Sequence, residues 1–434
     1  MNNQVLFRKP VLSWALYDWG NSAFATTVMA GFFPVFYNSL TGDLNAKDAQ
    51  FWFNITLALS SILVAISAPL LGAIADHGGK RKKFLLTFAC LGIVMTAGLA
   101  WVHAGMWSVG LILYGLGTVG FAGANIFYDS LLVEVAEDDE LDLVSSFGYA
   151  MGYIGGGLLF SVNVLMVTKP GWFGLADANA AVAFSFLSVS VWWAVFTIPL
   201  LRGVKEPVAL HGAKAGRAIQ EGVAHLLDTL REIKKLKILL LFLIGYWLYI
   251  DAVNTVIKVA VFFGGKVLNL PQQDLVLALL LTQFIAFPAA LAFGKLGSKI
   301  GPRPAILIGL VVYLASIIYA WRWLDTSFDF YKLAIAIGLV QGGVQSLSRS
   351  LFARMVPRSK AAEFFGFFNM VGKFAAFLGP LFMAGVPLLI AGTGERDAIL
   401  SLSILFIAGG FLLWKVDVKK GMAEAAAMDK ANKK

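Results

Sequence analysis

The chain has 434 residues, of which 59% are hydrophobic and only 14% carry a charged side chain, and its formal net charge is +9. Soluble globular proteins carry about 25% charged residues, so this composition excludes an ordinary soluble domain. The single cysteine, Cys90, excludes an intrachain disulfide and a cysteine metal cluster.

Twelve apolar segments follow one another along the chain, and each is long enough to cross a bilayer, which takes roughly 20 mostly apolar residues. We predict an all-α membrane protein with twelve transmembrane helices. The segments lie near 11–40, 50–76, 84–102, 106–136, 141–168, 179–201, 237–264, 273–297, 303–323, 328–356, 361–390 and 396–416.

The positive charge follows this topology. With twelve spans and a cytoplasmic N-terminus, 26 of the 35 Lys and Arg fall on the cytoplasmic side, six outside and three within spans. This bias is the positive-inside rule, and it predicts that both termini are cytoplasmic. It also accounts for the net charge without nucleic acid as a partner.

One long polar break divides the chain. Residues 202–236 begin rich in Gly and Ala, and from Ile219 to Leu230 their apolar positions follow helical spacing. We predict a cytoplasmic linker with an amphipathic helix on the membrane surface. The domains are then an N-terminal six-helix half (1–201), this linker, a C-terminal six-helix half (237–417) and a cytoplasmic tail (418–434).

The two halves share three short patterns in the same order. Asp18 and Asp251 each begin D-x-x-N followed by Ser or Thr, while Gly72 pairs with Gly294 and Asp129 with Arg349 at span ends. The offsets are 233, 222 and 220 residues. Three matches in register predict parallel repeats about an axis along the membrane normal, with substrate bound between the halves near the midplane.

The loop after the second span resembles the signature of the major facilitator superfamily at Gly72, Asp76, Gly79, Lys80 and Arg81, although Ser298 replaces the Asp in the second copy. YDWGNSAF, FYDSLL and GGVQSLSRSLFARMVP with AEFFGFF resemble its vacuole effluxer-like branch, whose fungal members are autophagy-related amino-acid effluxers. The resemblance implies that fold, and it implies export of amino acids.

Charged side chains within membrane spans are costly and therefore point to function or to pairing. Polar residues also share helix faces, because residues three or four apart lie on one side of a helix. We predict that the substrate contacts Asp251, Asn254, Gln341, Gln345, Lys373, Asn369, Asn21 and Tyr149. Coupling and gating are assigned to Asp18, Asp129, Asn125, Arg349, Lys258, Gly72, Asp76 and Arg81.

The predicted function is secondary active transport of a small polar solute, most simply an amino acid or related zwitterion or anion, with proton coupling as a further prediction. Three alternatives stay open. Asp18, Asp129 and Arg349 would equally form fixed structural pairs near a gate. The cavity would equally pass a lipid, lysolipid or amphipathic drug. A non-transporting receptor or assembly factor would also suit this fold.

Enzyme chemistry is not predicted. The chain has no HExxH, P-loop or GxSxG motif, and none of its four His lies deep in a span. We expect no cofactor and no metal. The expected partners are a small-molecule substrate, protons and membrane lipid, and the expected state is a monomer in a bacterial inner membrane.

Overall fold

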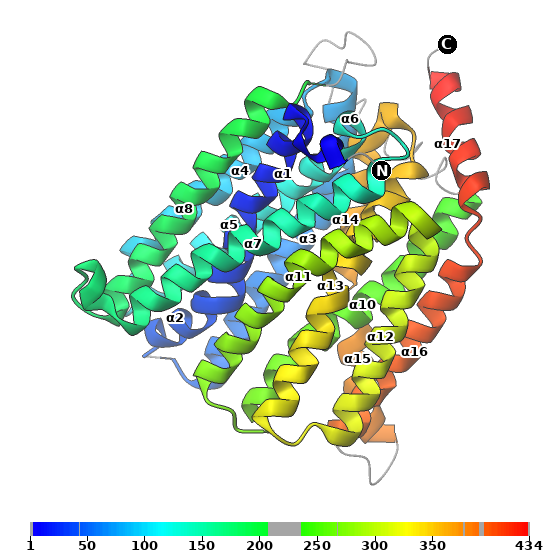
Figure 1. Ribbon diagram of the computed structural model, residues 1–434. Helices are drawn as coiled ribbons and strands as arrows, with labels where there is room; N and C mark the ends of the chain where they lie inside the picture. Colours follow the sequence, from blue (N-terminus) through cyan, green and yellow to red (C-terminus); the bar gives the residue numbers. More distant parts are fainter. Residues whose placement is uncertain are drawn as a thin grey trace.

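The computed structural model describes residues 3–42, 44–206, 236–266, 268–375, 378–389 and 395–432. In these ranges the chain forms helices and no strand. Figure 1 shows a bundle in which the short helix η1 (Asn3–Phe7) and the last helix, α17 (Val418–Asn432), lie at the same end. We call this end the terminal face.

The N-terminal half begins with a segment made of α1, η2 and α2. The helices of the N-terminal half are α1 (Lys9–Ala23), η2 (Phe24–Phe32), α2 (Phe33–Leu40), α3 (Ala46–Gly78), α4 (Arg81–Gly98), α5 (Trp107–Ser130), α6 (Leu132–Val135), α7 (Leu141–Thr168) and α8 (Ala178–Gly203). Short turns η3 (Leu99–Trp101) and η4 (Pro170–Phe173) lie between them.

The C-terminal half has a similar order of long helices. They are α10 (Lys237–Lys266), α11 (Gln272–Ile300), α12 (Pro302–Trp323), α13 (Ser327–Arg354), the turn η5 (Arg358–Lys360), α14 (Ala361–Phe374), α15 (Leu378–Leu389) and α16 (Glu395–Trp414). The predicted linker helix, 219–230, lies outside the described residues.

Among the described residues, eleven helical segments are long and apolar enough to cross a membrane. They correspond to every predicted segment except 328–356. That segment forms α13, which has 28 residues but is more polar than the others and is not one of the eleven. The prediction of an all-α membrane protein is therefore confirmed.

The outward faces of the long helices carry large apolar side chains. On α3, Leu59, Leu63 and Ile66 are 62%, 53% and 68% exposed, and Ile404 and Ile407 of α16 are similar. A continuous exposed apolar surface of this kind is costly in water but suits lipid. The helices therefore direct their apolar stripes outward as well as inward.

The first segment contains a π-helical stretch that the sequence analysis did not predict. From Phe24 to Phe32 the chain follows a π-helix, and the Phe33 N–H donates to the carbonyl of Val28, five residues earlier. π-helical turns are rare and often occur at functional sites. This one begins at Phe24, two residues after Ser22.

The two halves meet closely where α3 crosses α14. A Cβ atom on Gly72 would lie 2.3 Å from the Ala362 carbonyl oxygen, and one on Gly366 would lie 2.6 Å from the carbonyl oxygen of Ala68. Only glycine permits backbones to approach this closely, as in other membrane helix pairs. The crossing lies toward the terminal face.

Candidate functional site

A buried ion pair joins the halves near the terminal face. Arg349 of α13 donates from Nη1 to Oδ1 of Asp129 on α5 at 2.8 Å. Its Nε donates to the Ser145 hydroxyl at 2.9 Å and its Nη2 to the Ser145 carbonyl at 2.8 Å. A buried charge is tolerated when it is paired and hydrogen-bonded, and Arg349 meets both conditions.

Aromatic rings surround the same guanidinium. Its central carbon lies 4.4 Å from the ring centroid of Tyr149, 5.0 Å from Trp14 and 5.5 Å from Tyr128. Desolvated cations are attracted to the faces of such rings. Tyr149, predicted to contact substrate, therefore contacts Arg349 in this structure.

Asp129 has a second partner from the opposite half. Asn369 of α14 donates from Nδ2 to Asp129 Oδ2 at 3.3 Å and also to the Phe365 carbonyl at 3.0 Å. The structure thus brings Asp129, Arg349 and Asn369 together. Asn21, predicted to contact substrate, donates from Nδ2 to Oδ1 of Asn125, predicted to act in coupling, at 2.6 Å, and this bond joins α1 to α5 within the N-terminal half.

Asp18 lies beside this cluster and accepts hydrogen bonds from hydroxyls. The Ser22 hydroxyl donates to its Oδ1 at 3.1 Å, and the Tyr128 hydroxyl donates to its Oδ2 at 3.1 Å. Tyr128 also stacks on Trp14 with ring centroids 4.5 Å apart. Asp18 is therefore oriented by neutral groups, one of which packs against Arg349.

A second acid at the interface was missed by the sequence analysis. Asp142, 1% exposed on α7, accepts from the Ser350 hydroxyl at 2.5 Å and from Nη2 of Arg354 at 2.8 Å. Ser350 and Arg354 lie one and five residues beyond Arg349. The available signal was the i, i+4 spacing of Ser350 and Arg354 opposite an acid at the first turn of a span.

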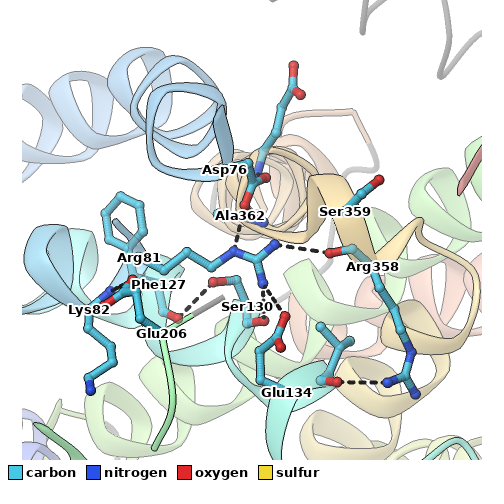
Figure 2. Close-up of polar contacts among 12 residues, drawn as sticks. Asp76, Arg81, Lys82, Phe127, Ser130, Glu134, Glu206, Arg358, Ser359 and Ala362 are labelled. Carbon is cyan, nitrogen blue, oxygen red and sulfur yellow. Dashed lines mark hydrogen bonds and ion pairs between the residues drawn. The ribbon is translucent and has the colours of Figure 1, made fainter. Parts of the chain in front are cut away.

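The motif residues Asp76 and Arg81 connect α3 to the first turn of α14 (Figure 2). Arg81 donates from Nε to Asp76 Oδ1 at 2.6 Å. Asp76 also accepts the backbone N–H groups of Ala362 at 3.2 Å and Glu363 at 2.9 Å. Since the first N–H groups of a helix lack partners and carry partial positive charge, Asp76 is the N-terminal cap of a helix in the opposite half.

Arg81 extends this contact to further groups, as Figure 2 also shows. It donates to Glu134 Oε1 at 3.0 Å and to the Arg358 carbonyl at 3.0 Å. Arg358 in turn pairs with Asp138 at 2.6 Å and donates to the carbonyl of Val133 at 3.0 Å. The loop that carries η5 is therefore held by the N-terminal half.

Asp251 lies in a different setting, where α14 ends and α15 begins. Its Oδ2 accepts the N–H of Leu378 at 2.9 Å and its Oδ1 accepts the N–H of Gly379 at 2.8 Å. Asn254 donates to the carbonyl of Ala375 at 3.2 Å. One side chain binds the start of α15 and the other binds the end of α14, so α10 holds both helix ends.

Two lysines lie near this junction. Lys373 is in the last turn of α14 and is half-buried, whereas Lys258 is exposed on α10, one turn beyond Asn254. Both lysines lie close along the chain to the two residues, Asn254 and Ala375, whose hydrogen bond joins α10 to the end of α14. Both lie within helices that are long and apolar enough to span a membrane.

The predicted stripe Gln341, Gln345 and Arg349 divides among three environments. Gln341 lines a cavity of about 90 Å³ together with Thr282 and Gln283 of α11. Gln345 accepts a hydrogen bond from the Tyr153 hydroxyl across the halves, at 3.3 Å.

The described residues contain no group of three His, Cys, Asp or Glu side chains that would hold a metal ion.

Comparison with known proteins identifies the family. The family model described as "Vacuole effluxer Atg22 like" matches residues 7–426. The chain belongs to this family. It is 36% identical over 416 residues to YxiO of Bacillus subtilis (strain 168), described as an uncharacterized MFS-type transporter, with 94% of each chain covered.

More distant relatives extend the comparison. Autophagy-related protein 22 of Kluyveromyces lactis is 23% identical over 407 residues, which cover 87% of this chain and 81% of that protein. The solved structure of the proton:xylose symporter XylE has a TM-score of 0.72 at 17% identity, with 99% and 100% of the two chains covered. FucP in its outward conformation has a TM-score of 0.68 at 10% identity, with 94% and 100% covered.

These likenesses establish the class of protein. The Atg22-like chain has the major facilitator fold, as the resemblance of its motifs implied, and it is an integral membrane transporter.

Proposed function

We propose that this protein is a secondary transporter that moves a small polar solute by alternating access. Residues 1–201 and 237–417 form two parallel six-helix repeats, α13 supplies the twelfth span, and 202–236 is the linker. The observation that carries this proposal is the position of the hydrogen bonds between the halves. They gather at the terminal face, on residues 345–369 of the C-terminal half.

The positive-inside rule assigns the terminal face and the tail 418–434 to the cytoplasm. In this state the transporter is therefore closed toward the cytoplasm. Asp76, Arg81 and Gly72 hold α3 against α14 there, and Arg349 with Asp129 closes the next layer inward. Cytoplasmic opening then requires these contacts to separate, which is the gating role that we assign to them.

The solute site lies between the halves, beyond the Arg349 layer. Its substrate is an amino acid or a related zwitterion or anion. We assign it to Lys373 and Gln345, and to Asp251 and Asn254 through the helix ends that they hold beside it. Further contacts come from Gln341, Asn369, Asn21 and Tyr149. Asn125 acts with the coupling and gating groups.

We assign proton coupling to Asp18. Its described partners are the hydroxyls of Ser22 and Tyr128, so it has no ion pair within the described part of the chain that would keep it ionised. Asp129 is paired with Arg349, and because a neighbouring cation favours the ionised carboxylate, Asp129 is less suited to carry a proton. We further propose that the protein is a monomer in a bacterial inner membrane and that it exports its solute, in keeping with the family description.

The test is counterflow in proteoliposomes that contain the purified full-length protein. Vesicles are preloaded with one unlabelled amino acid or organic acid, and uptake of its labelled form is followed with and without a pH gradient. The expected result is transient accumulation of at least one solute. The Lys332→Gln variant, which changes an exposed lysine at the opposite end of the bundle, should show the same counterflow as the unchanged protein. Absence of counterflow for every solute by folded protein would favour a receptor or assembly role.

A further inference from the structure

The charges inside the spans are not distributed as simple pairs. Asp129 is paired with Arg349, and Asp18 accepts hydrogen bonds from two hydroxyls of its own half. Asp251 uses both carboxylate oxygens on the N–H groups of α15. Among the contacts of the described residues, none of the three predicted intramembrane acids pairs with a lysine.

Lys258 lies one turn beyond Asn254 and Lys373 two residues before Ala375, and the hydrogen bond from Asn254 to the Ala375 carbonyl joins these parts of α10 and α14. Across the described ranges, neither lysine forms an ion pair with an Asp or Glu. Lys373 lies one helical turn beyond Asn369, whose side chain reaches Asp129 of the opposite half. Because residues four apart share a helix face, Lys373 is directed toward the space between the halves.

Two neighbouring ammonium groups within a membrane region are costly without a counter-charge. A carboxylate or phosphate group would satisfy both lysines at once through charge-assisted hydrogen bonds. An ammonium group on a substrate would instead need a free carboxylate, and Asp251 is engaged with backbone N–H groups. The local chemistry therefore favours an anion over a zwitterion.

We propose that the transported solute is a small organic anion whose carboxylate or phosphate is bound between Lys258 and Lys373. This inference rests on the proposed transport function and narrows its substrate class. Asn254 then acts as a positioning residue, because it holds the end of α14 from which Lys373 projects, and Asp251 holds the adjoining start of α15.

The test measures the thermal unfolding of purified full-length protein with ligands matched in length and different in charge. Succinate, 4-aminobutyrate and putrescine form one set, and glycerol 3-phosphate and glycerol form a second. A ligand that binds the native state raises its melting temperature by mass action. We expect succinate or glycerol 3-phosphate to stabilise the protein, and sodium chloride at matched ionic strength to have no such effect.

The variants locate the site. Lys373→Gln and Lys258→Gln should each weaken anion binding by about tenfold or more, since each removes a hydrogen bond to a charged group. Lys373→Arg should retain binding, and Lys332→Gln should leave it unchanged. An anion effect that survives Lys373→Gln in full overturns the proposal, and so does stabilisation by none of the anions.

Failure of this proposal is distinguishable from failure of transport. Equal or stronger stabilisation by 4-aminobutyrate or putrescine, with counterflow of an amino acid, overturns the anion site and leaves transport standing. Stabilisation by succinate that depends on both lysines, without counterflow of any solute, supports the anion site and overturns transport.

Discussion

Asp18 and Asp251 begin the same sequence pattern in α1 and α10, yet they bind different kinds of groups. Each accepts a hydrogen bond from a hydroxyl one turn later, from Ser22 at 3.1 Å and from Thr255 at 3.3 Å. Beyond that shared bond, Asp251 accepts two backbone N–H groups, whereas Asp18 accepts the side-chain hydroxyl of Tyr128.

The difference comes from the helix that each acid faces. A glycine lies against both: a Cβ on Gly152 would be 3.0 Å from Asp18 Oδ1, and one on Gly379 would be 2.8 Å from Asp251 Oδ1. Gly152 is inside the continuous helix α7, where its N–H is used within the helix. Gly379 is in the first turn of α15, where N–H groups need an outside acceptor. The same motif is therefore structural where it meets a helix end and available for side-chain chemistry where it does not.

The largest expected effect is that of Asp251→Ala. It leaves two N–H groups at the start of α15 without their acceptor, and we expect the free energy of unfolding to fall by about 3 kcal/mol. The measurement is unfolding by SDS titration in mixed micelles, with Asp18→Ala as the matched variant. A loss for Asp18→Ala as large as that for Asp251→Ala would break the distinction drawn between the two acids.

Alanine at the two glycines should follow the same order. At Gly379 the added Cβ would meet the Thr255 hydroxyl at 2.1 Å, and at Gly152 it would meet the Ser22 hydroxyl at 2.6 Å. Overpacking of this kind costs about 1–3 kcal/mol, and we expect Gly379→Ala near the upper end and Gly152→Ala near the lower end. Melting temperatures in detergent measure both, and the reverse order would contradict the structural role of the α15 start.

Asp18→Asn should change transport more than stability. The amide oxygen can accept from one hydroxyl and the amide N–H can donate to the other, so we expect a loss of only about 1 kcal/mol in the free energy of unfolding. An amide cannot take up and release a proton, so acceleration of flux by an imposed pH gradient should disappear, while counterflow at equal pH remains. Flux that still responds to the gradient would remove proton coupling from Asp18.

The smallest expected effect comes from removing the hydroxyl that bonds each acid, Ser22 beside Asp18 and Thr255 beside Asp251. Ser22→Ala and Thr255→Ala each remove the hydroxyl that bonds the acid one turn earlier, and each should cost about 1 kcal/mol, the usual worth of such a bond. The two losses should agree within experimental error once the methyl group of Thr255 is accounted for with Thr255→Val. A clear inequality would show that the shared hydroxyl supports only one site.

Much of the fold could be predicted because membrane helices are marked by long apolar runs, and Asp76 and Arg81 could be singled out because they belong to one short motif. The start of α15 was missed, although Gly379 and Pro380 mark it. Pro suits the first turn of a helix, where its missing N–H is not needed. An apolar run from 361 to 390 concealed this signal.

Partners that depend on tertiary structure could not be predicted. Asp142 and Arg354 are separated by 212 residues along the chain, and their contact follows from how α7 packs against α13. The π-helical turn after Ala23 has no distinctive sequence, because its apolar residues would suit an ordinary helix equally well. The acid of each motif was found from sequence, and its role required the partner helix.

The ion pairs that join the halves at the terminal face become less buried toward the surface. The side chains of Arg349 and Asp129 are 3% and 13% exposed, whereas those of Arg358 and Asp138 are 42% and 60% exposed. Dissolved salt screens exposed pairs strongly and buried pairs weakly. Rising ionic strength should therefore break the exposed pair of Arg358 and Asp138 before the buried pair of Arg349 and Asp129. The closure would then open from its surface inward.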